Sequence, residues 1–242
     1  RPHAALAYVA DTAHLPYGAR TADEIRAWCS EIGRFLVDEA GARTLVVACN
    51  TATAAAAEAL RERFPVPVVA VEPAVKPAAR LTRTGTIGIL ATEGTAHSER
   101  LGHLIRRFAD GIEVVTQPCP GLPEAIEADE RDRPCLHALV RRYVGPLVER
   151  GADVLVLGCT HYPLIRPIIE AEAGPRVAVV DSGDAVARRI DAVAPPGDGP
   201  CRFWATADAP SLRREATRIV GAPATVRRLN WNKGELREDA TR

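Results

Sequence analysis

The sequence predicts an α/β fold with mainly parallel sheets flanked by helices. Short apolar runs rich in β-branched residues alternate with amphipathic helical stretches, and this alternation is typical of parallel sheets covered on both faces. The composition is 47% hydrophobic and 26% charged over 242 residues. The chain therefore has enough apolar side chains for a sizeable core, in one large domain or two small ones.

The expected strands are short and apolar, and turn-forming or polar residues follow them. They are expected at residues 4–9, 44–48, 66–71, 86–91, 112–116, 153–157, 177–180, 202–205 and 225–229. In open parallel sheets, ligands bind outside the carboxyl ends of the strands. The residues that directly follow these strands are therefore the first candidates for function.

The expected helices carry recognisable start and stop signals. Residues 21–24 (Thr-Ala-Asp-Glu) match a capping box, and the helix that they begin is expected to end at Gly41. A second helix is expected over residues 134–150, with its stop at Gly151, and Pro163 suits the first turn of another helix. These helices separate the expected strands, as the α/β pattern requires.

Charge and hydropathy argue against nucleic acid or a membrane as the main partner. Lys plus Arg and Asp plus Glu each number 31, and no basic block is present. The apolar runs are interrupted by Arg, Glu or Pro, which excludes a transmembrane helix, and the first residues lack the apolar core of a signal peptide. The six cysteines could form three disulfides, but their wide spacing favours a cytoplasmic protein with reduced thiols.

Two of the expected strand ends resemble each other. Residues 45–51 (Leu-Val-Val-Ala-Cys-Asn-Thr) and residues 155–161 (Leu-Val-Leu-Gly-Cys-Thr-His) each consist of an apolar run, a cysteine and a polar side chain before a helix. A helix N-terminus lowers the pKa of a thiol and can also hold a carboxylate. Cys49 and Cys159 are therefore expected to provide two matched half-sites, each with an acid–base sulfur and an anion-binding turn.

Two thiols that face each other across a small carboxylate suit racemisation. One thiolate takes the α-proton from one face while the other thiol delivers a proton to the opposite face, and oriented donors stabilise the carbanion. Pyridoxal phosphate is disfavoured because the two lysines, Lys76 and Lys233, follow no phosphate-binding loop, so no cofactor is expected. A zinc site of Cys49, Cys159 and His161 lacks the usual ligand spacing, so no metal is expected either.

The remaining cysteines and most histidines are expected to be structural. The cysteines expected to pack in the core are Cys29, Cys119, Cys135 and Cys201. The histidines expected on the surface or on helix faces are His3, His14, His97, His103 and His137. His161 is different, because its position two residues after Cys159 would let it tune that sulfur or orient a substrate.

Three segments resemble the signatures of the bacterial glutamate racemases, in the cofactor-independent aspartate/glutamate racemase family. They are residues 48–52 (Ala-Cys-Asn-Thr-Ala), residues 158–164 (Gly-Cys-Thr-His-Tyr-Pro-Leu) and residues 11–18 (Asp-Thr-Ala-His-Leu-Pro-Tyr-Gly). Weaker matches occur at residues 71–74, 91–95 and 180–183. The matches follow the order of the family along nearly the whole chain. The second segment distinguishes the chain from the aspartate and hydantoin racemases of the same superfamily.

The resemblance implies a role for each matching residue. Cys49 and Cys159 would be the two proton donors and acceptors. The residues that would bind glutamate are Tyr17, Gly18, Asn50, Thr51, Thr160 and His161, with Thr92 and Thr95 as further candidates. The activity implied is the interconversion of L- and D-glutamate, which supplies D-glutamate for peptidoglycan synthesis and so for the cell wall and cell shape. The sequence leaves open whether the protein forms a homodimer.

The resemblance also implies two similar α/β domains with the active site in the cleft between them. The first domain would be discontinuous, with residues 1–74 and 181–242, and the second would comprise residues 75–180. The family normally opens with a strand and an Asp-Ser-Gly segment, which do not precede residues 4–9 here. We therefore expect a first domain that lacks its N-terminal strand. Residues 230–242 match no signature and are expected to be loose.

Three alternatives remain open at this point. A related cofactor-independent racemase, of the aspartate or hydantoin type, would differ in its contacts to the substrate side chain. An inactive relative that binds a partner protein would account for the absent N-terminal segment. A thiol hydrolase that uses Cys159 and His161 would leave Cys49 without a role, and residues two apart rarely form a nucleophile–base pair.

Overall fold

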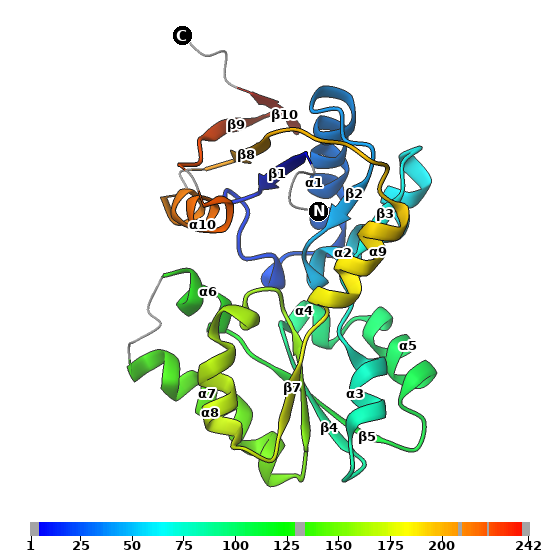
Figure 1. Ribbon diagram of the computed structural model, residues 1–242, viewed down its shortest axis with the longest axis vertical. Helices are drawn as coiled ribbons and strands as arrows, with labels where there is room; N and C mark the ends of the chain where they lie inside the picture. The colour runs from blue at the N-terminus through cyan, green and yellow to red at the C-terminus, as the bar shows by residue number, and fades with distance from the viewer. Residues whose placement is uncertain (1–4, 129–133, 208–209, 222, 239–242) are drawn as a thin grey trace.

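The computed structural model describes residues 5–128, 134–207, 210–221 and 223–238, and these residues form an α/β fold (Figure 1). The strands are β1 (Leu6–Ala10), β2 (Leu45–Val47), β3 (Val68–Ala70), β4 (Thr86–Ala91), β5 (Glu113–Pro118), β6 (Val154–Gly158), β7 (Ala178–Val180), β8 (Cys201–Ala205), β9 (Val226–Asn232) and β10 (Glu235–Glu238). Every strand expected from the sequence is present, and the predicted fold class is confirmed. β10 was not predicted.

Helices connect most of these strands. They are α1 (Ala22–Arg34), α2 (Asn50–Arg63), α3 (Val75–Leu81), α4 (Glu93–Ala96), α5 (Glu99–Phe108), α6 (Leu122–Glu127), α7 (Pro134–Glu149), α8 (Arg166–Ala173), α9 (Gly183–Val193) and α10 (Pro210–Val220). Two short 3-10 helices, η1 (Tyr17–Ala19) and η3 (Tyr162–Ile165), and one π-helical turn, η2 (Phe35–Glu39), complete the described part of the chain. None of the helices in these described residues is long and apolar enough to cross a membrane.

The four strands β5, β4, β6 and β7 form one parallel sheet in that order. All residues of its two inner strands are buried, and their side chains alternate between two cores. Ile87 and Val156 face a core with α3 and α5, whereas Leu90 and Leu155 face a core with α7 and α8. Figure 1 shows these two helix pairs on opposite sides of the sheet. This packing on both faces holds the carboxyl end of β6 in place.

The other strands form a mixed sheet and a separate parallel pair. The mixed sheet has the order β1–β8–β9–β10, in which β10 alone is antiparallel to its neighbour, and β2 pairs with β3. Within the described residues, β1 and β2 each pair along one edge only. The chain passes from β3 to α3 and from β7 to α9 near the boundaries expected between the two domains. The division at residues 74/75 and 180/181 stays a prediction.

The start and stop signals of the helices are in place. Thr21 and Glu24 form the expected reciprocal capping box at the start of α1. The helix then widens into η2 and stops where Gly41 takes a positive φ of 73°. Gly151, with a φ of 87°, follows α7 in the same way. The π-helical turn that connects α1 to Gly41 was not expected.

The expectation of a loose C-terminal tail is wrong for residues 230–238. These residues complete β9 and form β10, and the two strands make an antiparallel hairpin. The hairpin is held because Leu229 and Leu236 are fully buried against Phe35 and Trp204. Residues 239–242 lie outside the described part of the chain.

Candidate active site

Cys49 is the N-cap residue of α2, two residues after the end of β2. Its backbone is extended, and the backbone N–H of Ala52 points to its sulfur at 3.5 Å. Burial raises the pKa of the Cys49 thiol; the N–H groups of Ala52 and Thr51 act in the opposite direction, and Cys159 raises the pKa further. The expectation of a lowered pKa is therefore wrong for Cys49, because desolvation outweighs the helix terminus. Near neutral pH this residue is a thiol.

Cys159 follows β6, is buried, and belongs to a chain of three polar groups. Its sulfur lies 3.6 Å from Nδ1 of His161, and Nε2 of the same ring lies 2.7 Å from Oε1 of Glu127 in α6. Burial alone would lower the pKa of His161, but the hydrogen bonds to Cys159 and Glu127 outweigh burial and raise it to about 10. His161 is therefore an imidazolium near neutral pH and can stabilise negative charge on the Cys159 sulfur.

The turn after Cys159 differs from the one after Cys49. An α-helix does not begin here: Tyr162 starts the 3-10 helix η3, and α8 follows only at Arg166. The interruption has a local cause, because Pro163 and Pro167 both lack a backbone N–H. The expectation of two matched helix termini is therefore wrong for Cys159, where His161 provides the positive charge instead.

Tyr17 and Gly18 lie in the loop that follows β1. The hydroxyl of Tyr17 donates to Oδ2 of Asp11 at 2.7 Å. Burial and the neighbouring Asp11 carboxylate raise the pKa of Tyr17, so its hydroxyl stays a donor. A Cβ on Gly18 would lie 3.4 Å from Cβ of Thr92, which shows how closely this loop approaches the N-cap of α4.

Three threonine hydroxyls join the start of α2 to α4. Oγ1 of Thr51 lies 2.9 Å from Oγ1 of Thr92 and 3.3 Å from Oγ1 of Thr95, and the latter two lie 3.1 Å apart. Thr51 and Thr95 are buried. The structure thus brings together Gly18, Thr51 and the two further threonine candidates.

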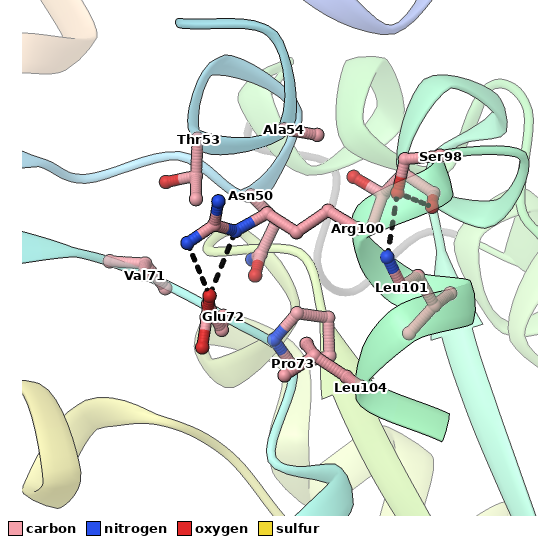
Figure 2. Close-up of a pocket in the computed structure, with 11 residues that line it drawn as sticks. Asn50, Thr53, Ala54, Val71, Glu72, Pro73, Ser98, Arg100, Leu101 and Leu104 are labelled. Atoms are coloured by element: carbon pink, nitrogen blue, oxygen red, sulfur yellow. Dashed lines mark hydrogen bonds and ion pairs between the residues drawn. The ribbon is translucent and has the colours of Figure 1, made fainter. Parts of the chain in front are cut away.

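Asn50 points into a cavity whose lining includes neither Cys49 nor Cys159 (Figure 2). The cavity measures about 10 Å³, room for about one water molecule. Oδ1 of Asn50 is buried and has no hydrogen-bond partner among the residues that the structure describes. Beside it, Arg100 pairs with Glu72. The side chain of Asn50 therefore lies apart from the hydrogen-bonded groups Cys159, His161 and Glu127. Thr160, the residue after Cys159, is exposed.

Glu127 was not expected from the sequence, and Asp11 was expected only as part of the signature at residues 11–18. His14, expected on the surface or on a helix face, lies half-buried in the loop after β1. His14 is stacked on Trp28 at 3.9 Å between ring centroids, and its Nδ1 lies 2.8 Å from Asp11. The position of Asp11, directly after the first strand, was a signal that could have identified it. No local signal connects Glu127 to His161, which is 34 residues away in the sequence.

None of the six cysteines forms a disulfide. Cys29 and Cys119 are buried as expected, but the expectation that Cys135 and Cys201 pack in the core is wrong: both are exposed, each near the start of its helix or strand. Among the described residues, no group of three or more His, Cys, Asp or Glu side chains is arranged to hold a metal ion. The groups available for chemistry are therefore two thiols in different electrostatic surroundings, one imidazolium and several hydroxyl and amide donors.

The model of the Asp/Glu/Hydantoin racemase family matches residues 1–190. The glutamate racemase of Pseudomonas aeruginosa is 48% identical over 236 residues, which cover 94% of this chain and 89% of that protein. The glutamate racemase of Ectopseudomonas mendocina is 44% identical over 93% of this chain and 88% of its own length.

Two solved structures share the fold over nearly the whole chain. A glutamate racemase isoform of Bacillus anthracis gives a TM-score of 0.83 at 29% identity, covering 97% of this chain and 90% of the other. The Escherichia coli glutamate racemase, solved with L-glutamate and the activator UDP-MurNAc-ala, gives 0.82 at 31% identity, covering 93% of this chain and 88% of the other.

Proposed function

This chain belongs to the Asp/Glu/Hydantoin racemase family, whose members are isomerases, and we propose that it interconverts L- and D-glutamate through Cys49 and Cys159. The observation that carries the proposal is the chain of groups from Cys159 through His161 to Glu127. Around Cys49 the sulfur meets backbone N–H groups of α2 instead. The glutamate racemases that are 44–48% identical to the chain support the choice of substrate.

The proposed reaction is a proton transfer across the two faces of Cα. The thiolate of one cysteine removes the α-proton and becomes a thiol, and the electron pair stays on the substrate as a carbanion. The thiol of the other cysteine then protonates the opposite face and becomes a thiolate. Nothing is gained or lost overall, and the reverse reaction exchanges the two roles. No cofactor is needed in this scheme.

The two cysteines enter this reaction from different electrostatic surroundings. The imidazolium of His161 lies beside the Cys159 sulfur, whereas burial raises the pKa of the Cys49 thiol. Each substrate enantiomer requires the thiolate on the cysteine that faces its α-proton, so the two directions of the reaction use the two cysteines in opposite roles.

The proposed glutamate ligands are the residues matched to the family signatures. They are Tyr17, Gly18, Asn50, Thr51, Thr160 and His161, assisted by Thr92 and Thr95. The backbone N–H of Asn50, at the start of α2, suits the α-carboxylate, since those of Thr51 and Ala52 point to the Cys49 sulfur. Since the Asn50 side chain points into its own cavity, its contribution would come from this backbone. We further propose that the D-glutamate serves peptidoglycan synthesis in the cytoplasm.

Exchange of the α-proton in D₂O, without added pyridoxal phosphate, tests the proposal. We expect the chain to exchange and racemise both L- and D-glutamate, and Cys49→Ser or Cys159→Ser to slow racemisation by about 10²- to 10⁴-fold, the contribution of a positioned acid or base. Cys201→Ser, an exposed cysteine in β8, is the matched control and should keep the parental rate.

Other outcomes of the same assay separate the alternatives. Exchange of aspartate or a hydantoin in preference to glutamate would identify a related racemase of another specificity. No exchange with any of these substrates would contradict the proposal and favour an inactive relative that binds a partner protein. Hydrolysis that survives Cys49→Ser but not Cys159→Ser would instead support the thiol hydrolase.

A further inference from the structure

We infer that Trp231, in the C-terminal hairpin, is a positioning residue that holds the substrate loop of Tyr17 in place through the Asp11 carboxylate. The inference rests on the proposed function, because it concerns a loop proposed to bind glutamate. Trp231 lies in residues 230–242, which match no signature of the family.

Asp11 is a buried carboxylate at the junction of three chain segments. Its side chain is 5% exposed, and a buried charge of this kind needs several donors. Oδ1 accepts from the hydroxyl of Thr206, after β8, at 2.7 Å and from the indole N–H of Trp231, in β9, at 3.1 Å. Oδ2 accepts from the hydroxyl of Tyr17 at 2.7 Å and lies 2.8 Å from His14. The two oxygens of the Asp11 carboxylate thus connect the loop that carries Tyr17 to the sheet that contains β8 and β9.

Aromatic contacts strengthen the same connection. The ring of His14 is parallel to that of Trp28 in α1, at an interplanar angle of 6°, and meets the ring of Trp231 edge-on at 5.0 Å. Tyr17 also contacts Trp28, with the ring centroids 5.8 Å apart. The loop is therefore held between a helix on one side and the hairpin on the other, and Trp231 contributes both a ring and a donor.

The β9–β10 hairpin has its own contacts to α1, which allow it to position the loop that carries Tyr17. Its Leu236 is fully buried, the backbone N–H of that residue donates to Glu31 at 2.9 Å, and its carbonyl accepts from Arg34 at 3.1 Å. These anchors lie on α1 and do not involve Asp11. The position of Trp231 is therefore set independently of the loop that it contacts.

The substitution Trp231→Phe tests the inference, because it removes the indole donor and keeps an aromatic ring. We expect it to raise the KM for glutamate about tenfold, since a hydrogen bond to a charged group is lost, and to leave kcat within about twofold, because the two cysteines are untouched. We also expect faster amide hydrogen exchange in residues 11–20, measured by mass spectrometry without substrate.

Trp204→Phe is the matched control. Trp204 is buried in the neighbouring strand β8 and packs edge-on against Phe35, but its indole N–H has no partner among the described residues. This variant loses an indole donor of the same kind without loss of a hydrogen bond to Asp11. It should therefore keep the parental KM and the parental exchange in residues 11–20.

The outcomes separate this inference from the proposed function. If Trp231→Phe and Trp204→Phe give the same KM and the same exchange in residues 11–20, Trp231 does not position the loop. If the parent chain fails to convert glutamate, the proposed function is overturned, and the exchange comparison alone then decides the role of Trp231.

Discussion

Two cysteines with similar sequence contexts have different electrostatic surroundings. Cys49 receives backbone N–H groups but remains a thiol because burial raises its pKa. Cys159 instead lies beside an imidazolium, whose charge is maintained by the carboxylate of Glu127. The hydrogen bonds of His161 to Cys159 and to Glu127 of α6 both contribute to this difference, so the two proposed half-sites are not equivalent. Glu127 acts through His161 and is therefore a positioning residue.

The substitution Glu127→Gln should move the alkaline limit of activity. His161 is protonated below a pKa of about 10, and removal of a carboxylate partner lowers that pKa. The pH above which kcat/KM falls should therefore decrease, by about 1–3 units for the loss of an ion-pair partner. The pH profile of kcat/KM measures this shift. Glu124→Gln, an exposed residue on the same helix, is the control, and identical profiles for the two variants would refute the role of Glu127.

At the scale of elements, the position of Cys159 depends on how closely β6 approaches β4. Gly158 is the last residue of β6, and a Cβ at this position would lie 2.7 Å from the backbone oxygen of Leu90. A backbone atom within a parallel sheet has little freedom to move away. Glycine at this position is therefore a requirement of the sheet, and it directly precedes the cysteine.

We expect Gly158→Ala to lower the free energy of unfolding by about 1–3 kcal/mol, the usual cost of a forced contact in a packed core. Racemisation should slow as well, because the strand end carries Cys159. Gly145→Ala in α7 is the control: a Cβ there meets no atom within 4 Å, so a gain of about 0.5–1 kcal/mol is expected from the helix. Urea unfolding of both variants measures the difference, and equal stabilities would contradict the strand-contact argument.

At the scale of the whole molecule, the segments after β3 and after β7, which connect the sheets, are hydrogen-bonded to each other. The hydroxyl of Ser182, after β7, donates to the backbone carbonyl of Glu72, after β3. The carboxylate of the same glutamate pairs with Arg100 of α5, which also reaches Glu58 of α2 at 2.9 Å. Together with the threonine cluster between α2 and α4, these contacts set the relative position of the segments that carry the two cysteines.

Ser182→Ala should weaken this junction. Ser182 is buried, so its loss leaves the carbonyl of Glu72 without that donor, and the free energy of unfolding should decrease by about 1 kcal/mol. Ser30→Ala, on the half-buried face of α1, should have a smaller effect. Thermal and urea unfolding compare the two, and an equal loss in both variants would show that the junction makes no specific contribution.

The sequence by itself determined the features whose causes are local. The alternation of apolar strands and helices, the capping box at Thr21, the glycine stops and the two cysteine motifs each depend on residues within a few positions of one another. The same motifs identified the family that the comparisons confirm. These features could be predicted because backbone conformation and side-chain periodicity act over short distances along the chain.

Only the tertiary structure decided the features that depend on distant residues or on burial. The pairs Glu127–His161 and Asp11–Trp231 join positions 34 and 220 residues apart, and no local pattern records either contact. The raised pKa of Cys49 has the same origin, since desolvation depends on everything packed around the sulfur. Sequence motifs thus identified the reactive groups, whereas packing decided which of them are charged and which are held in place.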